Sequence, residues 1–199
     1  MATKKKSAPL PVPPREAIIA AALKIADDGG WRAATLRELS EAAALPFAEV
    51  YGLFETPGHV AAAVLGDAVT AAMDEVLPDA SLSPKDRIFD AAMNVFDGLK
   101  DRRTALGAML AAYRLRPIAG APALGALARF ARVTLERAGI GAGGAAGAAR
   151  IAVLARALSL VLGVFAEDDA GLSRTMAALD TRLREAERWA KRLGWSDPA

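Results

Sequence analysis

The chain has 199 residues, of which 53% are hydrophobic, so it can bury a sizeable core, and its lack of cysteine excludes disulfides and thiol chemistry. The formal net charge is only +2, but residues 101–150 hold eight arginines and two acids, whereas residues 61–100 hold three basic and seven acidic side chains. There is no apolar run of about 18 residues or more and no apolar segment of a secretory signal, so we expect a cytoplasmic protein without a transmembrane helix.

The N-terminal region combines an arm with a first helix. Residues 1–13 are rich in lysine and proline, and we predict a disordered arm whose lysines either follow DNA phosphates or are simply solvated. From Arg15 onward, apolar side chains recur on one helical face. Gly29 and Gly30 end this helix, because glycine adopts the left-handed conformation common at helix ends.

Two short helices are predicted next. Thr35 suits the N-cap of a helix from Leu36 to about Ala43, and a glutamate three residues later completes a capping box. After a tight turn, Pro46 suits the first position of a short third helix that ends near Gly52 to Phe54. Two helices joined by a turn of about three or four residues form a helix-turn-helix, whose second helix can enter a DNA major groove.

The head carries the residues of a known family. They are Ile18, Ala22, Gly29, the run Thr35-Leu36-Arg37-Glu38-Leu39-Ser40, Ala43, Leu45, Val50, Tyr51 and Phe54. With them the segment resembles the DNA-binding domain of TetR-type transcriptional regulators. The resemblance implies an all-α fold of about nine helices, with a helix-turn-helix head over residues 14–58 and a helical-bundle body over residues 59–199 that binds a ligand and dimerises.

The resemblance also implies a set of contacts to double-stranded DNA: Thr35, Arg37, Pro46, Phe47, Ala48, Glu49, Tyr51 and His59. The Tyr51 hydroxyl can donate to a phosphate oxygen, although the ring can equally be structural. Thr35, Arg37 and His59 can approach the DNA backbone, or they can serve as a cap and as surface residues.

The presumed recognition helix departs from the family pattern. TetR-type proteins usually have Gly where Ala44 stands, Ser where Pro46 stands and Lys where Pro57 stands. The segment 46–52 contains no Lys, Arg, Asn or Gln, the side chains that most often read base edges. Its one acid, Glu49, can accept from a cytosine amino group or repel phosphate.

The rest of the chain is predicted to be helical, with a flexible joint at the glycine-rich residues 139–147. The order Gly139, Gly141, Gly144 matches a dinucleotide fingerprint, but a helix precedes it where that site needs a strand. The predicted body helices span residues 57–77, 85–99, 101–115 with Asp101 as the cap, 123–138, 148–165 and 172–193.

Met and aromatic side chains on three successive body helices form either an adaptable ligand pocket or ordinary core. They are Phe89, Met93, Phe96, Met109, Tyr113 and Phe130. Arginines of the same region can pair with an acidic ligand or simply face solvent; they are Arg102, Arg103, Arg114, Arg116, Arg129 and Arg132.

The last two helices are predicted to pair. The penultimate helix is apolar on nearly all sides, and the last carries an apolar seam at Met176, Leu179, Leu183, Ala186, Ala190 and Leu193. In TetR-type proteins these two helices usually build a homodimer. Trp189 and Trp195 beside basic residues also fit a helix lying on a membrane surface.

The chain has one histidine and no nucleophile motif, so we expect neither an enzyme nor a metal or cofactor site. The leading hypothesis is a TetR-like regulator, a repressor released from its operator by a small apolar or acidic effector. The alternative is a TetR-fold protein that has lost DNA binding and binds lipid or membrane, like an accessory protein of ubiquinone biosynthesis; the acidic head and the Trp-bearing last helix favour it. A helical dimerisation module with neither activity is a third possibility.

Overall fold

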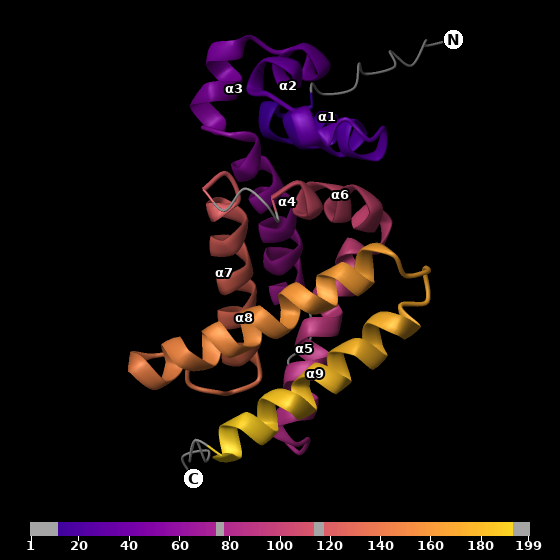
Figure 1. Ribbon diagram of the computed structural model, residues 1–199. Coiled ribbons are helices and arrows are strands. Elements are labelled where there is room, and N and C mark those ends of the chain that lie inside the picture. The colour runs from indigo at the N-terminus through magenta and orange to yellow at the C-terminus, as the bar shows by residue number, and fades with distance from the viewer. Residues whose placement is uncertain (1–11, 75–77, 114–117, 193–199) are drawn as a thin grey trace, which may run out of the picture.

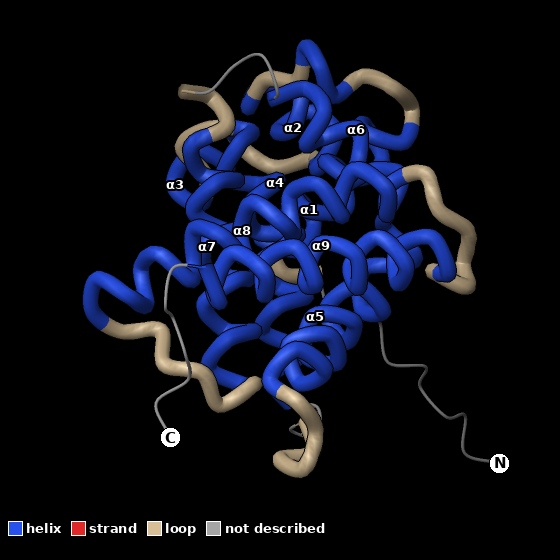
Figure 2. Tube along the Cα trace, turned by 60° about the horizontal axis from the view of Figure 1, so that its bottom comes forward, coloured by secondary structure: helices blue, strands red, loops and turns tan. Residues whose placement is uncertain are grey.

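A computed structural model describes residues 12–74, 78–113 and 118–192, and this part of the chain is all helical, as the sequence predicts (Figures 1 and 2). Residues 1–11 of the predicted arm, the predicted end of the last helix at Leu193, and Trp195 lie outside the described residues. The helices are α1 (Pro14–Asp27), α2 (Leu36–Ala43), α3 (Phe47–Leu53), α4 (Pro57–Ala71), α5 (Pro84–Leu99), α6 (Arg103–Tyr113), α7 (Ala121–Arg137), α8 (Gly144–Ala166) and α9 (Ser173–Arg192). The described ranges also contain three 3-10 turns: η1 (Trp31–Ala33), η2 (Ala72–Asp74) and η3 (Lys100–Arg102).

The helices form a small head on a larger body. Helices α1, α2 and α3 gather at one end, and α4 runs from this head down into the body beside α7 (Figure 1). Helix α6 lies directly beneath α1 and contacts it, while α8 and α9 run side by side across the other half (Figure 1). The head is thus seated on α4 and α6.

One apolar core runs through head and body. Ile18, Leu39 and Val50 are fully buried in the head, and they belong to the same cluster as Phe96 and Leu179 in the body. The head therefore shares its core with the body, and we expect the two to unfold together.

The loop in the glycine-rich segment is shorter than the predicted residues 139–147. Helix α8 already begins at Gly144, so only the first part of residues 139–147 is a loop. Gly147 is buried where a Cβ atom would collide with the backbone of Ala142, so glycine is needed there for close packing. Because α7 precedes this segment, the dinucleotide fingerprint has no strand to follow.

The predicted helix cap at Asp101 is wrong. Asp101 lies inside the turn η3, which carries the chain from α5 into α6 without a break, so no free helix end is present for it to cap. Helix α6 begins two residues later, at Arg103.

Helix α8 is, within the described ranges, long and apolar enough to cross a membrane by length and composition alone. It packs against α6, α7 and α9, and Leu158, Val161 and Phe165 are buried in the core. Such packing is typical of a core helix of a folded domain.

Two residues hold the turn between α8 and α9. The carboxylate of Asp168 accepts from both the N–H and the hydroxyl of Thr175, each at 2.7 Å, and both residues are buried. Burial acts to raise the pKa of Asp168, but these bonds and the N–H of Asp169 outweigh it and hold that pKa below its ordinary value.

The predicted seam of α9 is partly buried in the monomer. Leu179 and Leu183 belong to the core, Met176 is 39% exposed, and the side chains of Ala190, Leu193 and Trp189 lie outside the described part.

Candidate nucleic-acid interface

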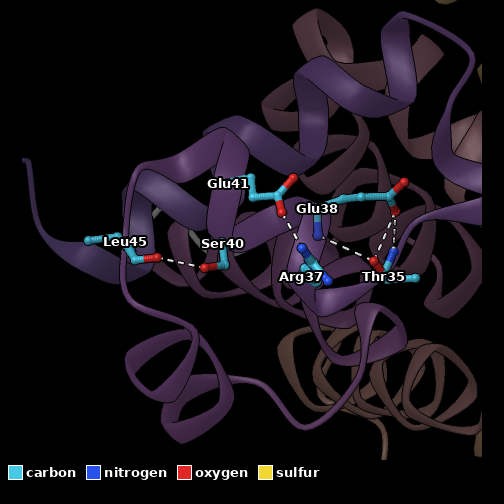
Figure 3. A network of polar contacts seen from close by, with 6 residues as sticks. All are labelled: Thr35, Arg37, Glu38, Ser40, Glu41 and Leu45. Carbon is cyan, nitrogen blue, oxygen red and sulfur yellow. Dashed lines mark hydrogen bonds and ion pairs between the residues drawn. The ribbon is translucent and has the colours of Figure 1, made fainter.

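The first helix of the helix-turn-helix is held by the capping box that the sequence predicts (Figure 3). The hydroxyl of Thr35 accepts from the N–H of Glu38 at 3.2 Å. The carboxylate of Glu38 accepts in return from the N–H of Thr35 at 2.8 Å and from its hydroxyl at 3.0 Å. Both donors of Thr35 are therefore occupied, and a phosphate would have to displace Glu38 to bind them.

The turn into α3 has a left-handed residue. Ala44 has φ 53° and ψ 40°, a conformation that glycine tolerates far better than alanine. The N–H of Leu45 donates to the carbonyl of Ser40 at 3.1 Å, and the Ser40 hydroxyl donates to the carbonyl of Leu45 at 2.6 Å (Figure 3). These two bonds fix the angle between α2 and α3.

One face of α3 anchors it and the other faces solvent. Val50 is fully buried and Phe54, just beyond the helix, is 6% exposed. On the outer side Phe47 is 52% exposed and Tyr51 is 57% exposed, with their rings stacked at a centroid distance of 6.2 Å. Helix α3 therefore projects an apolar surface.

The remaining predicted contacts surround this helix. Pro46 is the N-cap of α3, so the helix begins at Phe47, one residue later than predicted. Ala48 and Glu49 are exposed. His59 is half-buried in the first turn of α4, where its Nδ1 lies 3.1 Å from the hydroxyl of Thr56, the N-cap of that helix.

The cations of the head are mostly engaged by neighbouring acids. Arg37 donates through Nε to Glu41 at 3.0 Å. Arg15 forms two hydrogen bonds with Asp67 of α4, at 2.9 and 2.7 Å, which raise the pKa of Arg15. Lys24 is paired with Asp28 at 2.7 Å. Because residues 12–60 contain four basic and seven acidic side chains, the head has a net charge of −3.

Comparison with known proteins identifies the fold. No protein-family model and no curated protein matches the sequence. Among solved structures, a TetR transcriptional regulator from Rhodococcus sp. RHA1 is 20% identical with a TM-score of 0.61, over 86% of this chain and 93% of that one. The fatty acid degradation regulator FadR from Bacillus halodurans is 16% identical with a TM-score of 0.52, over 90% and 96% of the two chains.

The chain has the fold of TetR-type regulators. At these identities the likeness concerns the fold, and the all-α architecture predicted from the head motif is confirmed.

In this TetR-type fold, a cavity of about 600 Å³ lies among α4, α6, α7 and α8. Its lining is mostly small or aliphatic: Leu65, Thr104, Gly107, Ala108, Leu110, Ala111, Tyr113, Gly120, Ala123, Leu124, Leu127, Ser159, Leu162, Gly163, Ala166 and Glu167. At Gly107 the helices α6 and α8 approach so closely that a Cβ atom would collide with the Cβ of Ala166.

Of the six side chains predicted to form a pocket, only Tyr113 lines this cavity. Phe96, Met109 and Phe130 are fully buried, and the Phe96 ring lies 5.8 Å from that of Phe130, so they fill the core. Phe89 and Met93 are partly buried against the same core. The cavity lies instead where the inward positions of α6 and α8 are occupied by glycine and alanine.

The predicted arginines do not gather at the cavity in the described part. Arg103 donates to the carbonyls of Asp168 and Lys100, and Arg102, Arg129 and Arg132 are not among the lining residues. Arg114 and Arg116 lie outside the described residues.

Proposed function

We propose that the chain is a TetR-type transcriptional regulator that acts in the cytoplasm as a homodimer and represses transcription by binding double-stranded DNA. The observation that carries this proposal is the helix-turn-helix: α2 is capped, the turn at Ala44 is closed by Ser40 and Leu45, and α3 is anchored by Val50 with its other face open. An exposed second helix of a helix-turn-helix can enter a major groove, and the open face of α3 supports that role.

In this proposal, the α3 helices of two protomers enter successive major grooves, about 34 Å apart, on a near-palindromic operator. The Tyr51 hydroxyl donates to a phosphate oxygen at the groove edge, while its ring stays against Phe47. His59 and the first turn of α4 approach the backbone nearby.

The dimer contact is proposed on the outer side of α8 and α9. Leu160 is 42% exposed there, Met176 is 39% exposed, and Ala152 of α8 is exposed and small. Small side chains allow close approach of helices, and the exposed apolar ones gain burial when a second copy covers them.

A small apolar effector is proposed for the cavity. The hydroxyls of Thr104 and Ser159 can orient a polar end of the molecule. Among the described lining residues Glu167 is the only acidic or basic one, and an acidic side chain at the lining disfavours an acidic ligand, the alternative that the sequence leaves open. Helix α6 lines the cavity and also contacts α1 and η1 of the head, so a molecule that displaces α6 changes the spacing of the two heads.

A mobility-shift titration with the full-length protein tests the proposal. The probe is duplex DNA flanking the protein's own gene, with unrelated DNA of equal length as competitor, at about 50 mM salt. We expect a specific complex that is weakened by Tyr51→Ala and unchanged by Met73→Ala, an exposed apolar residue outside the head. Absence of any sequence-specific complex would refute the DNA-binding function.

A further inference from the structure

The outer surface of α3 is the strongest unexplained feature of the head. Relative to the buried Val50, the residues two positions away, Ala48 and Gly52, lie about 200° around the helix and so point almost directly outward. A Cβ atom added at Gly52 would meet nothing within 4 Å. The most protruding line of α3 is therefore made of the two smallest side chains.

Larger apolar side chains flank this line. Phe47 and Tyr51 form one edge as a stacked pair, and Leu53, 46% exposed, lies on the other edge beside Glu49. Because a helix with its side chains is about 10–12 Å wide and the major groove is about 12 Å wide, small outward residues let the backbone approach the base edges closely.

The chemistry of this surface excludes the usual base contacts. Bidentate recognition of guanine needs Arg or Lys, and that of adenine needs Asn or Gln, but α3 is Phe-Ala-Glu-Val-Tyr-Gly-Leu. Glu49 can accept only from an amino group, that of cytosine or of adenine. The base feature that the apolar side chains of α3 can recognise is the thymine 5-methyl group, which Ala and Phe side chains contact well.

We infer that α3 recognises thymine methyl groups, with Ala48 and Phe47 as the specificity-determining residues. This inference rests on the proposed function and names the base feature that the same surface reads. The acidic net charge of the head strengthens it, because phosphate attraction is small and apolar contact must supply a larger share of the binding free energy.

The test uses a duplex selected from a randomised DNA pool by the full-length protein. Thymines in each half-site of that duplex are then replaced one at a time by deoxyuridine, which removes only the methyl group. We expect about fourfold weaker binding per buried methyl group, and roughly fifteenfold for a symmetric pair of replacements.

Variants assign the effect to α3. In Phe47→Ala the thymine-to-uracil ratio of affinities at the affected position should fall toward one, whereas Met73→Ala, equally a removal of an exposed apolar side chain, should leave it unchanged. Far-ultraviolet circular dichroism confirms that both variants keep their helices.

The outcomes separate the two levels of the proposal. If a sequence is enriched but uracil substitution leaves its affinity unchanged at every position, the methyl inference is overturned and the regulator function stands. If no sequence is enriched above the unselected pool, both are overturned.

Discussion

Replacing Ala44 by glycine should stabilise the protein, although most substitutions by glycine destabilise a folded protein. Ala44 is exposed and has φ 53°, which costs an L-residue about 1–2 kcal/mol. Glycine removes that cost but adds about 0.4–1 kcal/mol of conformational entropy to the unfolded chain. The difference predicts a gain of about 0.5–1 kcal/mol in the free energy of unfolding.

Chemical denaturation followed by circular dichroism measures this gain. The matched control is Ala42→Gly, also exposed but inside α2, which should lose about 1 kcal/mol because its backbone is already helical. In a chain of this length each kcal/mol shifts Tm by about 2–4 °C. Equal destabilisation by both substitutions would show that Ala44 is not strained, and the description of the turn between α2 and α3 would then be wrong.

Three further predictions follow from other parts of the molecule. First, specific DNA binding by a variant lacking residues 1–11 should depend weakly on salt concentration. If each head of the dimer neutralises at most about two phosphates, the slope of log K against log salt concentration is no steeper than about −4. A slope near −8 would contradict the small phosphate attraction expected of an acidic head. Second, Asp168→Asn should cost about 2 kcal/mol at neutral pH, because it removes charge-assisted bonds to Thr175. Since the folded-state pKa of Asp168 is depressed, its contribution to the free energy of unfolding is present above about pH 4 and is lost as the pH falls through the folded pKa. The wild-type protein and the variant should therefore converge in stability in acid. A stability difference in urea titrations that stays constant with pH would exclude this role. Third, Gly107→Ala should lower Tm by the equivalent of about 1–3 kcal/mol, because its Cβ meets that of Ala166, whereas Gly163→Ala, with open space at its Cβ, should be nearly neutral in calorimetry.

The head could be predicted closely because its signals are local. The capping box of Thr35 and Glu38 involves groups three residues apart, and the end of α1 is marked by Gly29, which does take a positive φ of 79°. The predicted bounds of the second helix, from Leu36 to about Ala43, agree with α2. Such contacts are complete within one or two turns of chain, so no knowledge of distant packing was needed.

The body was harder because its decisive contacts are distant in sequence. Helical periodicity places Phe96 and Phe130 on inward faces, but it does not reveal that their rings fill the space between α5 and α7. The cavity arises where small residues of separate helices, such as Gly107 and Gly163, come together. A search for glycine and alanine facing inward on several body helices would have been a better signal than the aromatic side chains.

The contact between Gly107 and Ala166 has a mechanical consequence. With no room for even a methyl group between them, α6 cannot translate toward α8 when the neighbouring cavity is filled. The helix can instead rotate about its contact with Ala166. Because α6 also supports α1, a small rotation at that pivot would be delivered to the base of the head as a displacement.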